Sequence, residues 1–484
     1  MIFARLVRFV LVLALLSAGF IYLQPAKLVV GSKPEFASYQ VSAKDLELSC
    51  NGAAILAGGE SGTSVTNFEK VGSALTSVSY SGATQTKLTG FIGQGITGFG
   101  VRQDISDRIQ NPASVRVVDA SGTTSQGSAL LTANQLQFAK DKAINGLLGA
   151  PCLRPQSEFW FVGGSTSIGR EALLILTNPS PVDAIVDLTL FTENGASFAA
   201  GLSGISVPKS KTTVVPLSSF VLRAQSLAVH VKSQGGSITA LIQQKAVRGI
   251  NANGADYISP SEPASKEAAF PGILVRGATD TAKFRQSGSK YGDVQNMLRV
   301  FVPGEKDAKI TFQVLGTDAQ TFGTVLSVTA PAGKVSDFAI QGLKNGDYFG
   351  ILNSDAEVFS SVRLVRARAT TDRFVDFAWI NRAAGFGSGR FVAVPDAGIT
   401  KLSLVNLSAK PTTVTLKLGA ATIKRAVQAA SAEVVLVGAG LGVGIIPSGA
   451  DIFANLIVDV DGRLATLPVL DEKNISGQVA VSIH

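Results

Sequence analysis

The sequence predicts an all-β protein in which an N-terminal transmembrane signal-anchor helix is followed by tandem immunoglobulin-like β-sandwich domains. Three observations support this fold class: apolar and polar residues alternate with a period of two in many short segments, turn residues separate those segments, and one layout recurs along the chain. The 484 residues are 46% hydrophobic and 16% charged, and they include 50 glycines. This composition supplies several cores and excludes a largely disordered chain.

The first segment has the features of a targeting sequence. Arg5 and Arg8 precede an uninterrupted apolar run from Phe9 to Leu23. Positive charges ahead of such a run stay in the cytoplasm and direct the rest of the chain to the outside. The run has about 15 residues, short against the roughly 20 that span a bilayer, but residues 2–7 can extend it.

Retention of this segment is favoured over its removal. The two candidate cleavage sites, after Ala18 and after Ala26, each have a large residue where signal cleavage needs a small one. We therefore expect residues 1–30 to form a single-pass anchor in the cell membrane, with the N-terminus in the cytoplasm and the bulk of the chain outside. Secretion after signal cleavage is the alternative.

A spacer at residues 31–44 and a β-rich N-terminal region at residues 45–155 are expected next. This region has a helix-like piece around residues 131–148 and shows no clear copy of the layout that follows it. The chain has only two cysteines, Cys50 and Cys152. Outside the cell such a pair more often forms a disulfide than two free thiols, so we expect a bridge that ties the start of the region to its end.

Three sandwich repeats are predicted after this region, at residues 156–255, 256–385 with a linker at its start, and 386–484. Each begins with an alternating strand, a turn and a second alternating strand: Leu173–Ser180 opens the first copy, Leu402–Ser408 the third, and Leu298–Gly304 a more divergent second. Each copy ends in a hairpin, and these hairpins recur about every 105 to 120 residues, close to the length of one immunoglobulin-like domain.

The net charge of +8 indicates anionic partners. For a chain outside the cytoplasm these are lipid head groups and acidic wall polymers rather than nucleic acid. One stretch concentrates six arginines: Arg363, Arg366, Arg368, Arg373, Arg382 and Arg390. Because Arg366 and Arg368 alternate with apolar residues, a solvated strand face is the favoured interpretation, and an anion-binding patch is the alternative.

The sequence contains no convincing catalytic, cofactor-binding or metal-binding motif. Gly93–Gly98 matches the G-x-G-x-x-G pattern, but no alternation of strands and helices surrounds it, so a glycine-rich turn is favoured over a dinucleotide site. His230 is the only histidine before the last residue. It alternates with apolar residues and is expected on the solvated face of a strand. Asp461-Gly462 is expected to form a hairpin turn rather than begin a calcium loop.

The layout resembles an uncharacterised family of secreted or membrane-anchored actinobacterial envelope proteins that carry a domain of unknown function. The resemblance rests on the N-terminal anchor, the paired cysteines, the Phe-Trp-Phe-x-Gly-Gly strand at Phe159–Gly164, and the Leu-x-Leu-x-Asn-Pro turn at Leu174–Pro179. It implies an envelope location and brings no functional residues with it. The second copy departs from the pattern, because Pro303-Gly304 stands where the others have Asn178 and Asn406.

Together these observations predict a non-catalytic, membrane-tethered interaction or scaffold protein of the cell envelope, with no cofactor and with an unknown envelope protein or glycan as partner. The alternative is a glycan- or anionic-polymer-binding module that aids envelope assembly. An envelope glycan hydrolase is a third and less favoured hypothesis. Exposure of Trp160 or Trp379 in a groove would favour a glycan ligand, and two acids about 5 to 10 Å apart in a cleft would favour a hydrolase.

Overall fold

The fold was analysed in a computed structural model, which describes residues 36–41, 46–57, 68–81, 88–89, 95–96, 105–110, 114–117, 130–318, 323–370, 373–470 and 477–482. Nearly all regular structure in these ranges is β-strand, and α2 (Ala278–Gln286) is the one α-helix within them. The all-β prediction is therefore confirmed. The predicted anchor at residues 1–30 lies outside the described residues. None of the described helices has the length and apolar character needed to cross a bilayer.

The chain divides into two compact units. The small unit is a two-stranded antiparallel ribbon in which β1 (Phe36–Val41) pairs with β37 (Gly477–Ser482), so that Phe36 lies opposite Ser482. The segment expected to be a spacer thus contributes a strand. The last strand of the chain pairs with β1 rather than with a strand of the third repeat. The large unit spans residues 44–475 and contains all other elements described below.

The first repeat is a sandwich of two antiparallel sheets. One sheet has the order β12-β18-β14, with β15 and β16 both paired to the outer side of β14, and the other has the order β17-β13-β19-β20. The strands are β12 (Glu158–Val162), β13 (Arg170–Asn178), β14 (Ala184–Thr192), β15 (Gly195–Ser197), β16 (Ile205–Val207), β17 (Lys211–Pro216), β18 (Leu227–Gly235), β19 (Thr239–Arg248) and β20 (Asn251–Ile258). The 3-10 turn η1 (Leu217–Ser219) follows β17.

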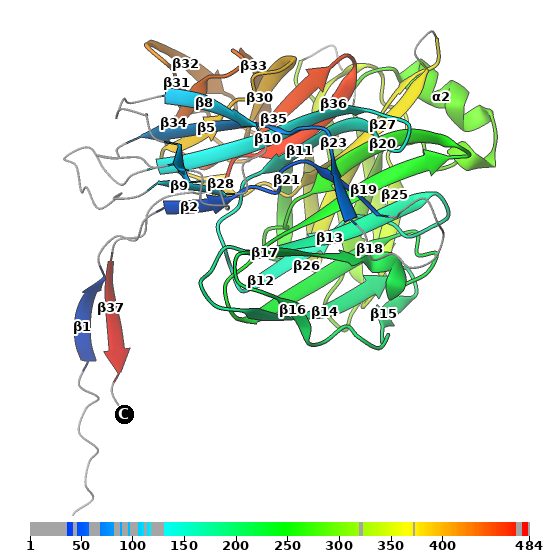
Figure 1. Cartoon of the computed structure of the whole chain (residues 1–484). Coiled ribbons are helices and arrows are strands. Elements are labelled where there is room, and N and C mark those ends of the chain that lie inside the picture. The colour runs from blue at the N-terminus through cyan, green and yellow to red at the C-terminus, as the bar shows by residue number, and fades with distance from the viewer. Residues whose placement is uncertain are drawn as a thin grey trace, which may run out of the picture. The chain divides into compact units, whose positions relative to one another are not determined.

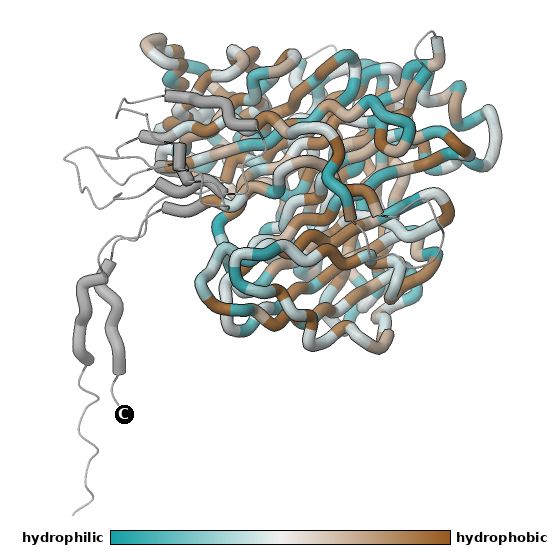
Figure 2. Tube along the Cα trace, viewed as in Figure 1, coloured by the Kyte–Doolittle hydropathy of each residue, from teal (hydrophilic) through white to brown (hydrophobic). Residues whose placement is uncertain are grey.

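Alternation along β14 shows how the sequence builds this sandwich. Val186, Leu188 and Leu190 are buried in the core between the sheets, whereas Ile185 and Thr189 are exposed. Because successive side chains of a strand point to opposite faces, this pattern can be satisfied only with one face against the core. Figure 2 shows hydrophobic and hydrophilic residues alternating along many of the strands.

The third repeat has the same strand order. Its sheets run β29-β34-β31-β32 and β33-β30-β35-β36, with the short β28 also paired to β35. The strands are β28 (Gly385–Phe386), β29 (Arg390–Ala393), β30 (Ile399–Asn406), β31 (Thr412–Leu418), β32 (Ala421–Val427), β33 (Ser431–Val437), β34 (Gly442–Ser448), β35 (Ile452–Val460) and β36 (Arg463–Pro468). The strands of each repeat can be numbered from one to eight if β15 and β16 together count as the fourth strand of the first repeat and β28 is left out of the third. Both sandwiches then have the sheet orders 1-6-3-4 and 5-2-7-8.

The second repeat keeps this order although two of its strands are fused. β26 (Gly346–Arg368) pairs with β21 and β23 through its first part and with β22 and β27 through its second part, so one strand serves as both the sixth and the seventh. The other strands are β21 (Ser265–Val275), β22 (Met297–Phe301), β23 (Ala308–Gly316), β24 (Thr324–Ala330), β25 (Val335–Ala339) and β27 (Phe374–Asn381). The connection between β21 and β22 carries α2 and the 3-10 turn η2 (Ser289–Tyr291).

The N-terminal region is a fourth copy that sequence patterns did not reveal. Its main sheet has the order β8-β5-β10-β11, again 5-2-7-8, while β2 pairs with β9 and β6 with β7, again 1-6 and 3-4. The strands are β2 (Leu46–Ser49), β5 (Leu75–Ser81), β6 (Leu88–Thr89), β7 (Gly95–Ile96), β8 (Ile105–Gln110), β9 (Ser114–Val117), β10 (Leu130–Lys140) and β11 (Asn145–Pro151). An extra hairpin of β3 (Ala54–Ala57) and β4 (Phe68–Val71) lies between β2 and β5.

Two expectations need correction here. The piece around residues 131–148 is not helical, since β10 and β11 form a hairpin there. Residues 131–137 are all buried, so this part of β10 has no solvated face and lacks the two-residue period by which strands are recognised. The strand order also differs from an immunoglobulin domain. There the first and second strands share a sheet, whereas here they lie in opposite sheets.

The eighth strands of the four repeats form a closed ring at the centre of the large unit. β11 packs against β20 and β36, and β27 packs against the same two strands (Figure 1). The backbones approach so closely that a Cβ atom at Gly146 of β11 would lie 2.4 Å from the backbone nitrogen of Ala255 in β20. The ring therefore brings the N-terminal repeat, through β11, against the third repeat, through β36.

Candidate functional site

The turns between the seventh and eighth strands gather at one end of the ring. Their described residues are 141–144, 249–250, 369–370, 373 and 461–462. Arg463 links the third repeat to the N-terminal repeat, because its guanidinium donates hydrogen bonds of 3.2 and 3.1 Å to Oδ1 of Asn145. The same guanidinium lies over the rings of Phe374 and Phe138, at 4.3 and 4.9 Å. Asp461 and Gly462 both have positive φ, which confirms the predicted hairpin turn.

The insert that carries α2 and η2 forms one wall of an open cleft of about 570 Å³ at this end. Asp280 in the first turn of α2 and Lys283 and Arg285 in its last turn complement the helix dipole. Phe284 is 1% exposed, its ring centre lies 5.0 Å from that of Tyr291, and both residues line the cleft. The insert thus turns a set of hairpin tips into a concave site.

The described lining of the cleft mixes polar and apolar residues, and it carries two cations, Lys142 and Arg373, against one acid, Asp141. Asp141, Lys142 and Asn145 come from the β10–β11 hairpin, and Asn251 and Asn253 follow the β19–β20 turn. The carboxylate of Asp141 already accepts a 2.9 Å hydrogen bond from the backbone N–H of Ala143.

Arg373, next to β27, is the second cation of the lining. Its guanidinium lies 4.5 Å from the ring centre of Phe284. Its partner in this arrangement comes from the insert, which is distant in the sequence. The cleft therefore offers an arginine whose position is set by a buried ring.

A largely buried ionic cluster lies next to Tyr291, one of the residues that line the cleft. Asp293, just after η2, pairs with Arg170 and Arg248, and it accepts a 2.6 Å hydrogen bond from Nη1 of Arg248. Burial alone would raise the pKa of Asp293, but the hydrogen bond from Arg248 and the charges of Arg363 and Arg170 outweigh it and hold the pKa well below its usual range. Arg248 also lies 5.3 Å from the ring centre of Tyr291, which connects the cluster to the cleft.

Three of the six predicted arginines bond to turns or to the buried cluster. Arg363 is buried, which lowers its pKa to about 10, and it donates to the carbonyl oxygen of Asp293. Arg366 donates to the carbonyl of Gly462, and Arg368 to that of Asp461. Arg366 and Arg368 thus hold the β35–β36 turn against the second repeat.

The other three predicted arginines have different surroundings. Arg373 lines the cleft. Arg382 donates to the carbonyl of Pro263, and Arg390 lies 5.2 Å from the ring centre of Phe386. The six therefore bond to different parts of the fold, and an anion-binding role remains a prediction, for which Arg373 is the best placed.

The aromatic and histidine candidates pack inside the fold. Trp379 is 4% exposed and lies against Arg299 and Arg363, with the nearer guanidinium 4.9 Å from its ring centre. Trp160 stacks on Phe359 at 4.6 Å between the first and second repeats. His230 was expected on the solvated face of a strand, and this expectation was wrong. Its ring stacks on Trp160 at 4.0 Å and bonds to Glu158, and burial lowers its pKa.

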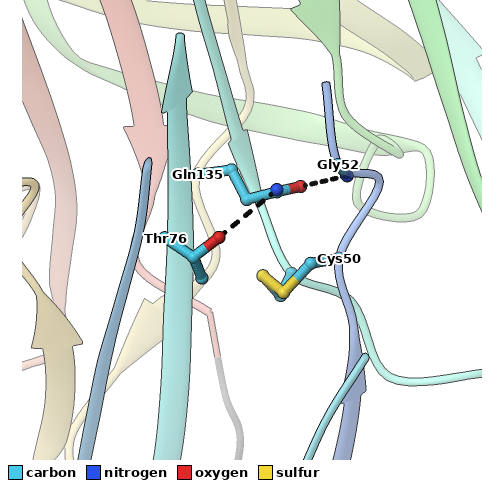
Figure 3. Close-up of a disulfide and its surroundings, with 5 residues drawn as sticks. Cys50, Gly52, Thr76 and Gln135 are labelled. Carbon is cyan, nitrogen blue, oxygen red and sulfur yellow. Dashed lines mark hydrogen bonds between the residues drawn. A yellow bond between two sulfur atoms is a disulfide. The ribbon is translucent and has the colours of Figure 1, made fainter. Parts of the chain in front are cut away.

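The disulfide prediction is confirmed. Cys50 and Cys152 are bridged, which closes the N-terminal repeat between the end of β2 and the end of β11. Beside the bridge, Gln135 accepts a hydrogen bond from the backbone of Gly52 and donates to the hydroxyl of Thr76 (Figure 3). The pattern Gly93–Gly98 lies mostly outside the described residues.

Two buried carboxylates in the ring escaped the sequence analysis. Asp256 of β20 accepts hydrogen bonds from the backbone N–H groups of Gly149 and Trp379, at 3.3 and 2.8 Å. Asp376 of β27 accepts from Leu147 and Ala255, at 3.1 and 3.2 Å. Burial raises the pKa of Asp376 to about 7 and that of Asp256 well above its usual range. The sequence signal was an aspartate followed by an aromatic residue within an apolar strand.

In the part of the chain that the structure describes, no three His, Cys, Asp or Glu side chains come together as metal ligands. Asp256 and Asp376 are 1% and 0% exposed, so their surroundings close them off from a substrate. Asp141 is the only acid among the described residues that line the cleft. The geometry of the cleft therefore suits binding through cations and amides.

Residues 106–443, more than half of the chain, match a family of unknown function, DUF5719. The chain belongs to the DUF5719 family. The match runs from β8 of the N-terminal repeat into β34 of the third repeat, so in this DUF5719 protein it covers strands from all four repeats. No curated protein matches the sequence.

Two solved structures show a weak similarity to this DUF5719 protein. One is the BSP domain of a biofilm-associated protein, with 8% identity and a TM-score of 0.13 over 94% of this chain and 99% of that chain. The other is a Ca²⁺-stabilised adhesin with which an Antarctic bacterium binds ice, with 9% identity and a TM-score of 0.10 over 82% and 91%. Similarity at this level indicates neither a shared fold nor a shared function.

Proposed function

We propose that this protein is a non-catalytic interaction or scaffold protein of the cell envelope, tethered to the membrane by residues 1–30, with its four repeats outside the cytoplasm. Arg5, Arg8 and the apolar run from Phe9 to Leu23 support the tether. The Cys50–Cys152 disulfide supports an oxidising compartment, since such bridges persist outside the cytoplasm.

The observation that carries the binding role is the cleft at the end of the ring. Hairpin turns from different repeats and an insert meet there, on a scaffold whose strands are held in closed sandwiches. Loops positioned by a rigid framework are the usual place for recognition. An anionic-polymer-binding module is the second candidate function, and Lys142 and Arg373 favour it over a neutral ligand.

Site-specific crosslinking in cells tests the binding role. A photoreactive amino acid replaces Ile250, which is 93% exposed beside the cleft, in the full-length chain. The control position is Val182, an apolar residue that is 53% exposed in the β13–β14 turn. This turn follows the end of β13, whereas the start of β13 pairs with the end of β19 next to Ile250, so the control lies at the opposite end of the repeat.

We expect envelope material to be crosslinked from position 250 and not from position 182. Equal yields from both positions, or none from either, would contradict a binding site at this end. Membrane fractionation of the same cells tests the tether. Recovery of mature protein in the medium, beginning after Ala18 or Ala26, would overturn it.

A further inference from the structure

We propose that the cleft binds an acidic polysaccharide, whose carboxylate or phosphate groups are held by Lys142 and Arg373. This inference rests on the proposed function and deepens it, because it names the chemistry of the ligand. Both side chains line the cleft and both residues are exposed. They belong to different repeats, so the site requires the ring to be closed.

Arg373 differs from most of the other arginines in its stretch in how its guanidinium is used. Arg363, Arg366, Arg368 and Arg382 each donate hydrogen bonds to protein oxygens. Within the part of the chain that the structure describes, the contact found for the Arg373 guanidinium is with the ring of Phe284. One face of the group is thereby positioned on a buried ring, while its N–H edges remain for an oxyanion, which they bind in a fork.

The neighbouring polar groups complete a donor set. Asn145 already uses its carbonyl oxygen to accept from Arg463, so its amide N–H groups are what it offers to a ligand. Asn251 and Asn253 add further amides to the lining. Asp141, the one acid among the described residues of the lining, has an oxygen occupied by the N–H of Ala143. Hydroxyl groups of a sugar can bond to amides, while its acidic groups need the cations.

The aromatic rings argue against a neutral sugar. Neutral sugars commonly bind by placing their C–H face on a bare aromatic ring. Here the ring of Phe284 carries Arg373 at 4.5 Å. The ring of Tyr291 has Arg248 and Lys290, each at 5.3 Å. Both rings therefore already carry a cation where a neutral-sugar site would present a bare ring, and Arg373 itself lines the cleft, which favours an acidic ligand.

Binding of labelled oligomers to the full-length chain in detergent tests this inference by fluorescence anisotropy. The probes are oligogalacturonate, which carries carboxylates, oligo(glycerol phosphate), which carries phosphodiesters, and neutral dextran. The site variant is Lys142→Gln with Arg373→Gln. The matched control is Lys424→Gln with Arg425→Gln, which removes the same charge from an exposed part of β32.

We expect the site variant to bind at least one acidic probe about tenfold or more weakly than the unchanged chain, because two charge-assisted contacts are lost. The control should stay within about twofold, since the Arg425–Glu433 pair is exposed. The acidic probe that loses affinity identifies the group that the cleft recognises. Equal weakening in both double variants, or dextran binding as tight as that of the acidic probes, would overturn the proposal.

A charge-preserving variant guards against misfolding. Lys142→Arg with Arg373→Lys keeps both cations, and we expect it to keep most of the affinity for the acidic probe. Loss of affinity in this variant to the level of the glutamine variant would contradict an electrostatic site. If crosslinking from Ile250 succeeds while no acidic probe binds, the ligand chemistry is wrong and the binding role stands. If both fail, both proposals fail.

Discussion

Asp256 and Asp376 lie on neighbouring strands of the central ring, and each carboxylate accepts backbone N–H groups from strands of two other repeats. Strands at the edge of a sheet have unpaired N–H groups that must find partners when they are buried. Here side-chain carboxylates supply the acceptors that a neighbouring strand would otherwise provide. The two aspartates thus join the N-terminal, first and second repeats without merging their sheets.

The burial of Asp376 makes stability depend on pH. Its pKa is raised to about 7 in the folded protein, so the folded state binds more protons than the unfolded state above the ordinary pKa of 3.8. The contribution of Asp376 to the free energy of unfolding is fully present below pH 3.8. It decreases by up to about 1.4 kcal/mol per pH unit as the pH rises from 3.8 to about 7. We expect urea denaturation to show lower stability at pH 8 than at pH 5, and a smaller difference in Asp376→Asn.

A surface carboxylate provides the control for that measurement. Glu305 is exposed in the turn between β22 and β23, and Glu305→Gln should leave the pH dependence unchanged. An identical pH dependence in Asp376→Asn and in the unchanged chain would show that the buried carboxylate does not control it.

Close packing of the ring strands makes Gly146 intolerant of a side chain. A Cβ atom there would lie 2.4 Å from the backbone nitrogen and 2.8 Å from the backbone oxygen of Ala255. We expect Gly146→Ala to destabilise the protein by about 1–3 kcal/mol, because the backbone must shift to admit it. Gly304→Ala is the control, since nothing lies within 4 Å of its added Cβ. Equal denaturation midpoints for the two variants would argue against a tightly packed ring.

The asparagine shared by two repeats anchors the turn after the second strand. Asn178 donates to the carbonyls of Val182 and Val207, both at 2.9 Å, and its oxygen accepts from the N–H of Ser180. We expect Asn178→Ala to cost about 1–3 kcal/mol, because buried backbone groups lose their partners. Thermal unfolding checks this value, and Asn253→Ala, in a half-buried position, serves as the control. A melting temperature equal to that of the control would contradict the anchoring role.

The same contacts recur at Asn406. It donates to the carbonyls of Lys410 and Val427 and accepts from Ser408. The second repeat has Pro303-Gly304 at this turn, so no equivalent substitution exists there.

Loss of the disulfide should weaken the N-terminal repeat. Cys50 and Cys152 are separated by 102 residues, and a bridge that closes a long loop restricts the unfolded chain. We expect Cys50→Ala with Cys152→Ala to lower stability by about 2–5 kcal/mol. Denaturation in the presence and absence of a reductant checks this value. The reductant should affect the unchanged chain and leave the double variant unaffected, and an effect on both would point to another cause.

Local patterns were sufficient to predict the strand content. The alternation in β14 and the turns at Asn178 and Asn406 depend on residues that are close in sequence, and the structure contains these strands and turns. The disulfide followed from the cysteine count. The fourth repeat was missed because β6 and β7 have only two residues each and β10 is largely buried on both faces.

The site depends on relationships that no local pattern contains. Arg373 gains its position from Phe284, which belongs to an insert between two earlier strands. Asp256 and Asp376 find their partners in other repeats, so their role follows from the order of the ring and not from their own strands. The sequence showed only an aspartate within an apolar strand. The packing of the ring explains it, because the partners of each carboxylate lie in other repeats.

The contact between β11 and β36 bears on how the protein reaches its final state. β36 is the last strand of the last repeat, so during synthesis or export the flank of β11 stays uncovered until almost the whole chain has emerged. Until then the side of β11 that β36 will cover is exposed. Exposed strands of this kind can associate with other chains. Completion of the fold is thus a late event, and a chain cut short before Arg463 leaves β11 of the N-terminal repeat without its β36 neighbour.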